Sequence, residues 1–220
     1  MCVPHHGGVD DYEDFDRLSS AVYIAARAGT VDCTAAFDLA ASWLEERPQD
    51  PDATELATLS IECAQASQPR MADVALRLLA TTEFRPGFKE EPGWLACLED
   101  AMRLVNRDVA ATGIHRPCQL RVHDDDGVNW SVNAYVETGD GYTGIAQGIY
   151  PASGADPVSA LVAVADDAQD ALMHALFAAW PVCPVHRLGA HASYHEEAAV
   201  WWCSGDGGHA VTAIGAWQGR

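Results

Sequence analysis

Apolar residues recur at helical spacing through the first half of the chain. Between Asp10 and Gly113 they form five stripes, and the breaks between these stripes carry residues that start or stop helices. Gly29 suits the left-handed position just past a helix, and Pro69 suits the first turn of one. The pattern predicts an all-helical bundle over residues 10–115, preceded by a flexible tail over residues 1–9.

The third stripe opens with the segment Asp52-Ala53-Thr54-Glu55. This order is typical of a capping box, in which the first and last side chains each accept a hydrogen bond from an otherwise unpaired backbone amide. A helix is therefore predicted to begin near Asp52. Cys33, Cys63 and Cys97 fall within the predicted helices, where a small buried side chain is favoured over a catalytic thiol.

The apolar period shortens after Arg116-Pro117, from that of a helix to the alternation of a strand. Alternating segments at 120–122 and 128–136, followed by a third at Tyr142–Tyr150, predict a three-stranded antiparallel meander. Asp156-Pro157 then opens a long helix with one apolar face. The sequence thus predicts an α+β protein: a helical bundle, then an α+β domain over residues 116–220 that ends in a small metal module over residues 181–220.

Two Cys/His pairs near the end of the chain have the spacing of a zinc site. Cys183 and His186 form a Cys-x-x-His pair, and Cys203 and His209 form a Cys-x5-His pair. Thiolate and imidazole are the ligands that structural zinc prefers. We therefore predict zinc bound by these four residues. His191 is an alternative to either histidine, and buried thiols or a Cys183–Cys203 disulfide are the alternative to metal.

The segments that flank these pairs are also informative. Strand-like segments at Ala199–Cys203 and Ala210–Trp217 place the ligands on turns that feed short strands. This arrangement resembles the zinc-ribbon and treble-clef class of zinc modules, over about forty residues only. Those modules more often carry cysteine at all four positions, and their second pair is spaced more tightly. The resemblance implies a zinc ion with a structural role.

Charge and cysteine content limit the classes of function. The formal net charge is −19, spread over both halves, and a field of that sign repels phosphate backbones, which excludes nucleic acid as a partner. Seven scattered cysteines favour reduced thiols, and no segment suits a membrane helix or a signal peptide, so a cytoplasmic location is expected. One lysine against twelve arginines suggests a GC-rich bacterial source.

Three functions remain open. The first is a non-catalytic zinc protein that acts through protein–protein interaction, since its acidic surface suits a basic partner and tryptophans at 180, 201, 202 and 217 lie near the metal module. The second is a zinc-dependent, hydrolase-like enzyme with Glu196, Glu197 or Asp206 as the base. The third is an acidic inhibitor, or nucleic-acid mimic, of a basic protein.

Three weaker candidate sites each have a simpler reading. His123-Asp124-Asp125-Asp126-Gly127 suggests a divalent cation, but a hairpin turn is favoured. Asp166, Asp170 and His174 share one helix face, where an exposed polar face is favoured over a metal site. Cys2, His5 and His6 fall in the predicted tail.

Overall fold

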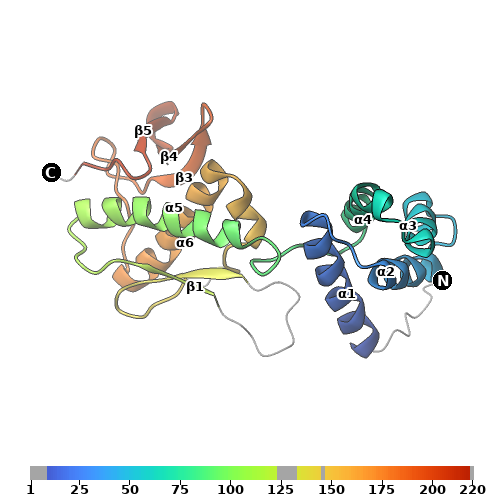
Figure 1. Cartoon of the computed structure of the whole chain (residues 1–220). Coiled ribbons are helices and arrows are strands. Elements are labelled where there is room, and N and C mark those ends of the chain that lie inside the picture. The colour runs from blue at the N-terminus through green and yellow to red at the C-terminus, as the bar shows by residue number, and fades with distance from the viewer. Residues whose placement is uncertain (1–8, 123–132, 145–146, 219–220) are drawn as a thin grey trace, which may run out of the picture. The chain divides into compact units, whose positions relative to one another are not determined.

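The structure of the chain, a computed structural model, describes residues 9–122, 133–144 and 147–218. It divides into two compact units, Met1–Pro86 and Gly87–Arg220. Helices are combined with antiparallel strands (Figure 1), so the predicted α+β class is confirmed.

The described part of the first unit is helical. Its elements are α1 (Val9–Arg27), α2 (Cys33–Glu46), α3 (Pro51–Glu62), the 3-10 turn η1 (Gln65–Ser67) and α4 (Gln68–Thr81). Each α-helix turns its apolar stripe inward, and Val22, Leu39, Leu56 and Leu78 meet in one core. The helical stripes of the sequence are therefore the buried faces of this unit.

The residue that caps the start of α3 differs from the sequence prediction. Asp50 caps the helix, since its Oδ1 accepts a hydrogen bond from the backbone N–H of Ala53 at 3.0 Å, and Pro51 occupies the first turn. Asp52 lies inside the helix and forms an ion pair with Arg77 of α4, with Nη2 and Oδ1 at 2.8 Å. The predicted capping box is therefore wrong, because a better cap residue precedes the proline.

A disulfide joins Cys33, at the start of α2, to Cys63, which caps the end of α3 in a left-handed conformation. Cys63 is exposed. This bond contradicts the prediction of two reduced, buried thiols. Since disulfides persist mainly in oxidising compartments, these two cysteines give no support to the predicted cytoplasmic location.

Serine at both Cys33 and Cys63 is expected to destabilise the first unit by about 3–4 kcal/mol, because the bond closes a loop with a sequence separation of 30 residues. Urea unfolding under non-reducing conditions, followed by circular dichroism, measures the loss. Dithiothreitol should lower the stability of the wild-type protein by a similar amount. Cys97→Ser, which keeps the disulfide, is the control. Equal unfolding midpoints for the wild type and the double variant would contradict the prediction.

The second unit combines two long helices with two small sheets (Figure 1). The helices are α5 (Pro92–Ala111) and α6 (Pro157–Leu176), and they pack against each other. One sheet pairs β1 (Gln119–Val122) with β2 (Ala134–Glu137), and the other has the order β3 (His191–His195), β4 (Ala198–Cys203), β5 (His209–Ala213). The 3-10 turns η2 (Pro151–Ala155) and η3 (Gly205–Gly207) complete it. None of the helices among the described residues has the length and apolar composition to cross a bilayer.

Helix α5 belongs to the second unit, apart from the four helices before it. Its buried residues Leu98 and Val105 share one core with Val164 of α6 and Trp201 of β4. The chain is therefore divided into its two compact units between Pro86 and Gly87, whereas the sequence prediction places a domain boundary near residue 115. Helical periodicity shows which face of a helix is buried, but it does not show what that face packs against.

Only two strands of the predicted three-stranded meander form a sheet among the described residues. β1 and β2 pair antiparallel, with Leu120 opposite Val136. Over its described residues the predicted third strand contributes only two isolated bridges, Ala134↔Ile149 and Glu137↔Thr143. The long helix forms as predicted, because Asp156 caps α6 by accepting the backbone N–H of Ser159.

Candidate metal centre

Four side chains that are far apart in the sequence converge at one end of the β3–β4–β5 sheet. Cys183 and His186 lie in the loop between α6 and β3, Cys203 ends β4, and His209 begins β5 directly opposite Cys203. Their candidate ligand atoms all lie within 4.8 Å of one another. The cluster could therefore hold a metal ion, as the spacing of the two pairs predicts.

The distances between these atoms suit tetrahedral zinc. Cys203 Sγ lies 3.5 Å from His186 Nδ1, and Cys183 Sγ lies 3.7 Å from His209 Nε2 and 3.9 Å from His186 Nδ1. With zinc–sulfur bonds near 2.3 Å and zinc–nitrogen bonds near 2.0 Å, tetrahedral ligands lie about 3.6 Å apart. Both thiols are free, so the alternative of a Cys183–Cys203 disulfide is wrong.

Backbone amides stabilise the thiolate form of Cys183. Burial opposes its ionisation, but hydrogen bonds from the backbone N–H groups of His186 and Val185, with further contributions from Cys203 and His209, lower the pKa of the Cys183 thiol to about 6. The backbone N–H of Gly205 also points at Cys203 Sγ, at 3.5 Å. The amides directed at Cys183 therefore favour the deprotonated thiol that a metal requires.

The loop that carries the first pair is closed by its own backbone. The N–H of Cys183 donates to the carbonyl of Leu188 at 2.8 Å, and the N–H of Arg187 donates to the carbonyl of Cys183 at 3.0 Å. On the opposite side Gly205 lies against His186, where a Cβ atom would be 2.6 Å from the imidazole Cγ. Glycine is required there for close approach rather than for flexibility.

His186 is oriented from outside the cluster. Its Nδ1 faces the two sulfurs, while its Nε2 lies 3.4 Å from Asp206 Oδ2. Carboxylates that accept the distal N–H of a metal-bound histidine fix the tautomer and orientation of the ring. Asp206 therefore lies where it can fix the orientation of the His186 ring, on the side away from the sulfurs.

Asp206→Asn is expected to weaken zinc binding by about tenfold. This is the lower end of the effect of such outer carboxylates, because the Asp206 side chain is 93% exposed. Competition with a fluorescent zinc chelator measures the dissociation constant. Glu197→Gln, at the far turn of the same sheet, provides the matched control. A variant that binds zinc as tightly as the wild type would refute the assignment of Asp206.

A buried carboxylate attaches the sheet to α5. Asp108 is completely buried, and its Oδ2 accepts the indole N–H of Trp201 at 2.7 Å and the backbone N–H of Gly215 at 2.7 Å. Its Oδ1 accepts the backbone N–H of Trp217 at 2.8 Å. Asp108 is not among the candidate residues predicted from the sequence, although a carboxylate between Val105 and Val109 on an apolar stripe indicates a buried polar contact.

A second buried polar side chain anchors the loop of the first pair. Gln169 of α6 donates from its amide nitrogen to the carbonyl of Trp180, at 2.6 Å, and to that of Ala190. These two carbonyls flank the loop on either side. The loop is thus held to the helix by hydrogen bonds that are buried from water, which supports a defined geometry at Cys183 and His186.

The tryptophans near the cluster are largely core residues. Trp180 and Trp201 are buried, with ring centroids 5.3 Å apart in an edge-to-face contact, and Trp217 packs against the same core. Trp202 is half-buried. Trp180 and Trp201 therefore belong to the core beside the cluster and offer no exposed aromatic surface.

The other candidate residues lie apart from the cluster. His191 begins β3 opposite Trp202 and is not among the four converging residues. Glu196 and Glu197 form the β3–β4 turn, about 20 Å from Cys203 at the usual rise per residue of a strand. Within the described ranges, Asp166, Asp170 and His174 form no metal-like cluster. The candidates at 123–127 and at Cys2, His5 and His6 lie outside the described residues.

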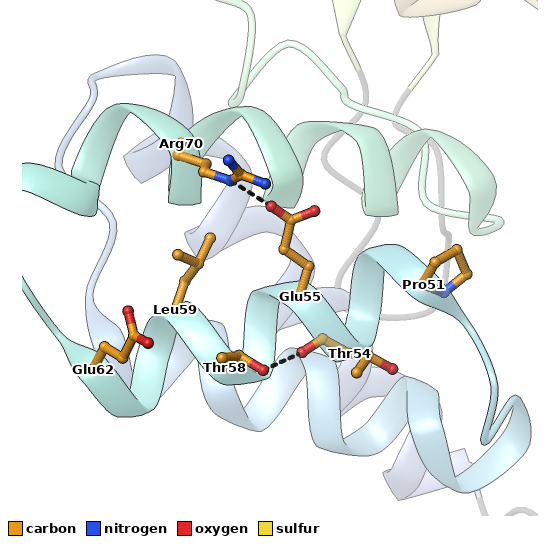
Figure 2. A pocket seen from close by; sticks show the side chains of 7 residues that line it. All are labelled: Pro51, Thr54, Glu55, Thr58, Leu59, Glu62 and Arg70. Carbon is orange, nitrogen blue, oxygen red and sulfur yellow. Dashed lines mark hydrogen bonds and ion pairs between the residues drawn. The ribbon is translucent and has the colours of Figure 1, made fainter.

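A shallow groove of about 560 Å³ runs along α3 in the first unit (Figure 2). Several of its polar groups are engaged within the protein: Arg70 Nε pairs with Glu55 at 2.5 Å, and the Thr58 hydroxyl donates to the carbonyl of Thr54 at 2.9 Å. No nucleophile with an adjacent base lines it, so the groove offers no catalytic arrangement.

Comparison with known proteins found no match from which a function could be inferred. No family model matches the chain, and no curated protein and no solved structure matches it either.

Proposed function

We propose that this protein is a non-catalytic zinc protein that acts through protein–protein interaction, with one zinc ion that holds the end of the second unit in shape. The observation that carries the proposal is the closed set of four ligand atoms, two thiols and two imidazoles within 4.8 Å of one another. Four protein ligands fill the tetrahedral coordination of zinc, and such closed sites are structural.

The surroundings of the cluster support a structural role. Cys183 and Cys203 are completely buried, and the amides that point at their sulfurs belong to the loops that the metal would tie together. A catalytic zinc ion needs an open position for water and a base beside it. Glu196 and Glu197 are too distant, and Asp206 faces the outer nitrogen of His186. These placements favour the structural reading over the hydrolase-like enzyme.

Metal analysis of chelator-washed protein tests the proposal. We expect about one zinc ion per chain that survives mild chelation, and X-ray absorption should give two sulfur and two nitrogen ligands without a water oxygen. Protein with no tightly bound metal would refute the structural role. A zinc ion bound by only three protein ligands and one water would instead favour the enzyme.

A further inference from the structure

The loop that carries Cys183 and His186 exposes apolar side chains to solvent. Val185 is 72% exposed, Leu188 is 50% exposed and Val182 is 37% exposed, and the exposed guanidinium of Arg187 lies among them in the sequence. We call these four residues the knuckle surface. The end of α6 adds further exposed apolar side chains: Met173, Leu176 and Phe177.

The geometry of the loop explains this exposure. Cys183 and His186 turn inward to the cluster, and the hydrogen bonds between residues 183 and 187 or 188 fix the loop as a tight turn. The residues between and after the two ligands must then face outward. The Val182↔Gly189 bridge closes the base of the loop, so the four side chains of the knuckle surface lie on one compact element. Exposed apolar groups gathered in this way are typical of interaction sites.

The charge of this region is opposite to that of the rest of the chain. The segment from Ala171 to His195 contains no Asp or Glu, although the chain has 32 acidic residues in 220. Other arginines pair with carboxylates, for example Arg77 with Asp52 and Arg116 with Asp140. Within the described ranges Arg187 has no ion pair, and the nearby carboxylate of Asp206 faces His186.

We propose that the knuckle surface docks an acidic, amphipathic segment of a partner protein. Apolar side chains of that segment pack on Val185 and Leu188, and one of its carboxylates pairs with Arg187. An arginine beside apolar side chains is the composition that interaction hot spots favour. A short segment is favoured over a second copy of this chain, because two whole chains of net charge −19 repel each other more strongly than one chain repels a short acidic segment. The inference rests on the proposed function, because the metal is what would hold the loop in this form.

Selection from a random peptide library tests the surface without a known partner. Zinc-loaded, full-length protein is used to select from 16-residue peptides displayed on phage, and enriched peptides are synthesised for fluorescence anisotropy. We expect enriched sequences that combine Asp or Glu with Leu, Phe or Trp. Their affinity should fall with rising salt concentration.

Matched variants locate the binding site. Arg187→Glu and Val185→Ser should each weaken peptide binding at least tenfold while zinc content stays unchanged. Arg103→Glu reverses another exposed arginine, and Ile61→Ser removes a side chain that is 73% exposed in the first unit. Both controls should bind the peptides like the wild type.

Three peptide results would overturn the inference: no enriched peptides, enriched peptides that are basic, or equal peptide binding by all variants. Self-association in sedimentation that Arg187→Glu abolishes would replace the partner segment with a second copy. If the wild-type protein binds zinc with four ligands but fails these peptide tests, the structural zinc site is still supported. Protein without zinc would refute the proposed function itself, so the two failures are distinct.

Discussion

Cys203→Ala is expected to remove about one zinc ion per chain and to unfold the β3–β5 sheet together with the loop that carries Cys183. Structural zinc contributes about 10–16 kcal/mol of apparent binding free energy in small zinc modules, which is as large as the total stability of a typical domain. Cys203 ends β4 and lies opposite His209, so its loss removes one ligand and loosens the start of β5. The remaining three ligands would leave an open and weakened site.

Zinc content per chain, together with amide hydrogen exchange, measures this effect. Exchange should become fast over residues 181–213 in the variant and in chelator-treated wild-type protein. It should stay slow in α2–α4, because these helices have a core of their own. Cys97→Ser is the matched control, since Cys97 is a free thiol outside the cluster. Equal zinc content in wild type and Cys203→Ala would show that Cys203 is not a ligand.

The features that the sequence predicts well are those encoded by short-range patterns. The stripes that become α1–α5 are read from spacings of three and four residues, and the cap at Asp156 marks the start of α6. The two Cys/His pairs are also local signals, because each places two ligands on one turn. Their convergence could be anticipated because only together do they complete a four-ligand set.

Features that depend on long-range packing escape this reasoning. Nothing in the stripe of α5 tells that Leu98 packs in one core with Trp201 rather than with α4. The Cys33–Cys63 bond requires the end of α3 to return to the start of α2, a consequence of how the hairpin closes. The sequence pattern does not predict strand β3, because Ala192 and Tyr194 give only a short alternation.

Asp108→Ala is expected to destabilise the second unit by about 4 kcal/mol. The substitution leaves the buried indole N–H of Trp201 and the partly buried backbone N–H groups of Gly215 and Trp217 without an acceptor. A buried unpaired donor costs about 1–3 kcal/mol, and a partly buried one costs less. These three bonds tie α5 to β4 and to the segment after β5. The substitution therefore weakens the contact between the helices and the sheet that carries the cluster.

Asp108→Asn keeps the volume of the side chain but changes the hydrogen bonds that it can accept. Its single carbonyl oxygen can replace Oδ2 and keep the bonds to Trp201 and Gly215, while its amide group meets the N–H of Trp217. A loss of about 1–2 kcal/mol is expected, smaller than that of the alanine variant.

Denaturant unfolding of zinc-loaded protein measures both variants of Asp108, and the proton resonance of the Trp201 indole N–H reports the bond directly. Asp100→Ala, an exposed carboxylate on the same helix, is the control and should change stability by less than about 0.5 kcal/mol. Should Asp108→Ala unfold within about 1 kcal/mol of the wild type with an unshifted Trp201 resonance, Asp108 would not hold the sheet. The positions of Cys203 and His209 would then depend on the metal and the apolar core alone.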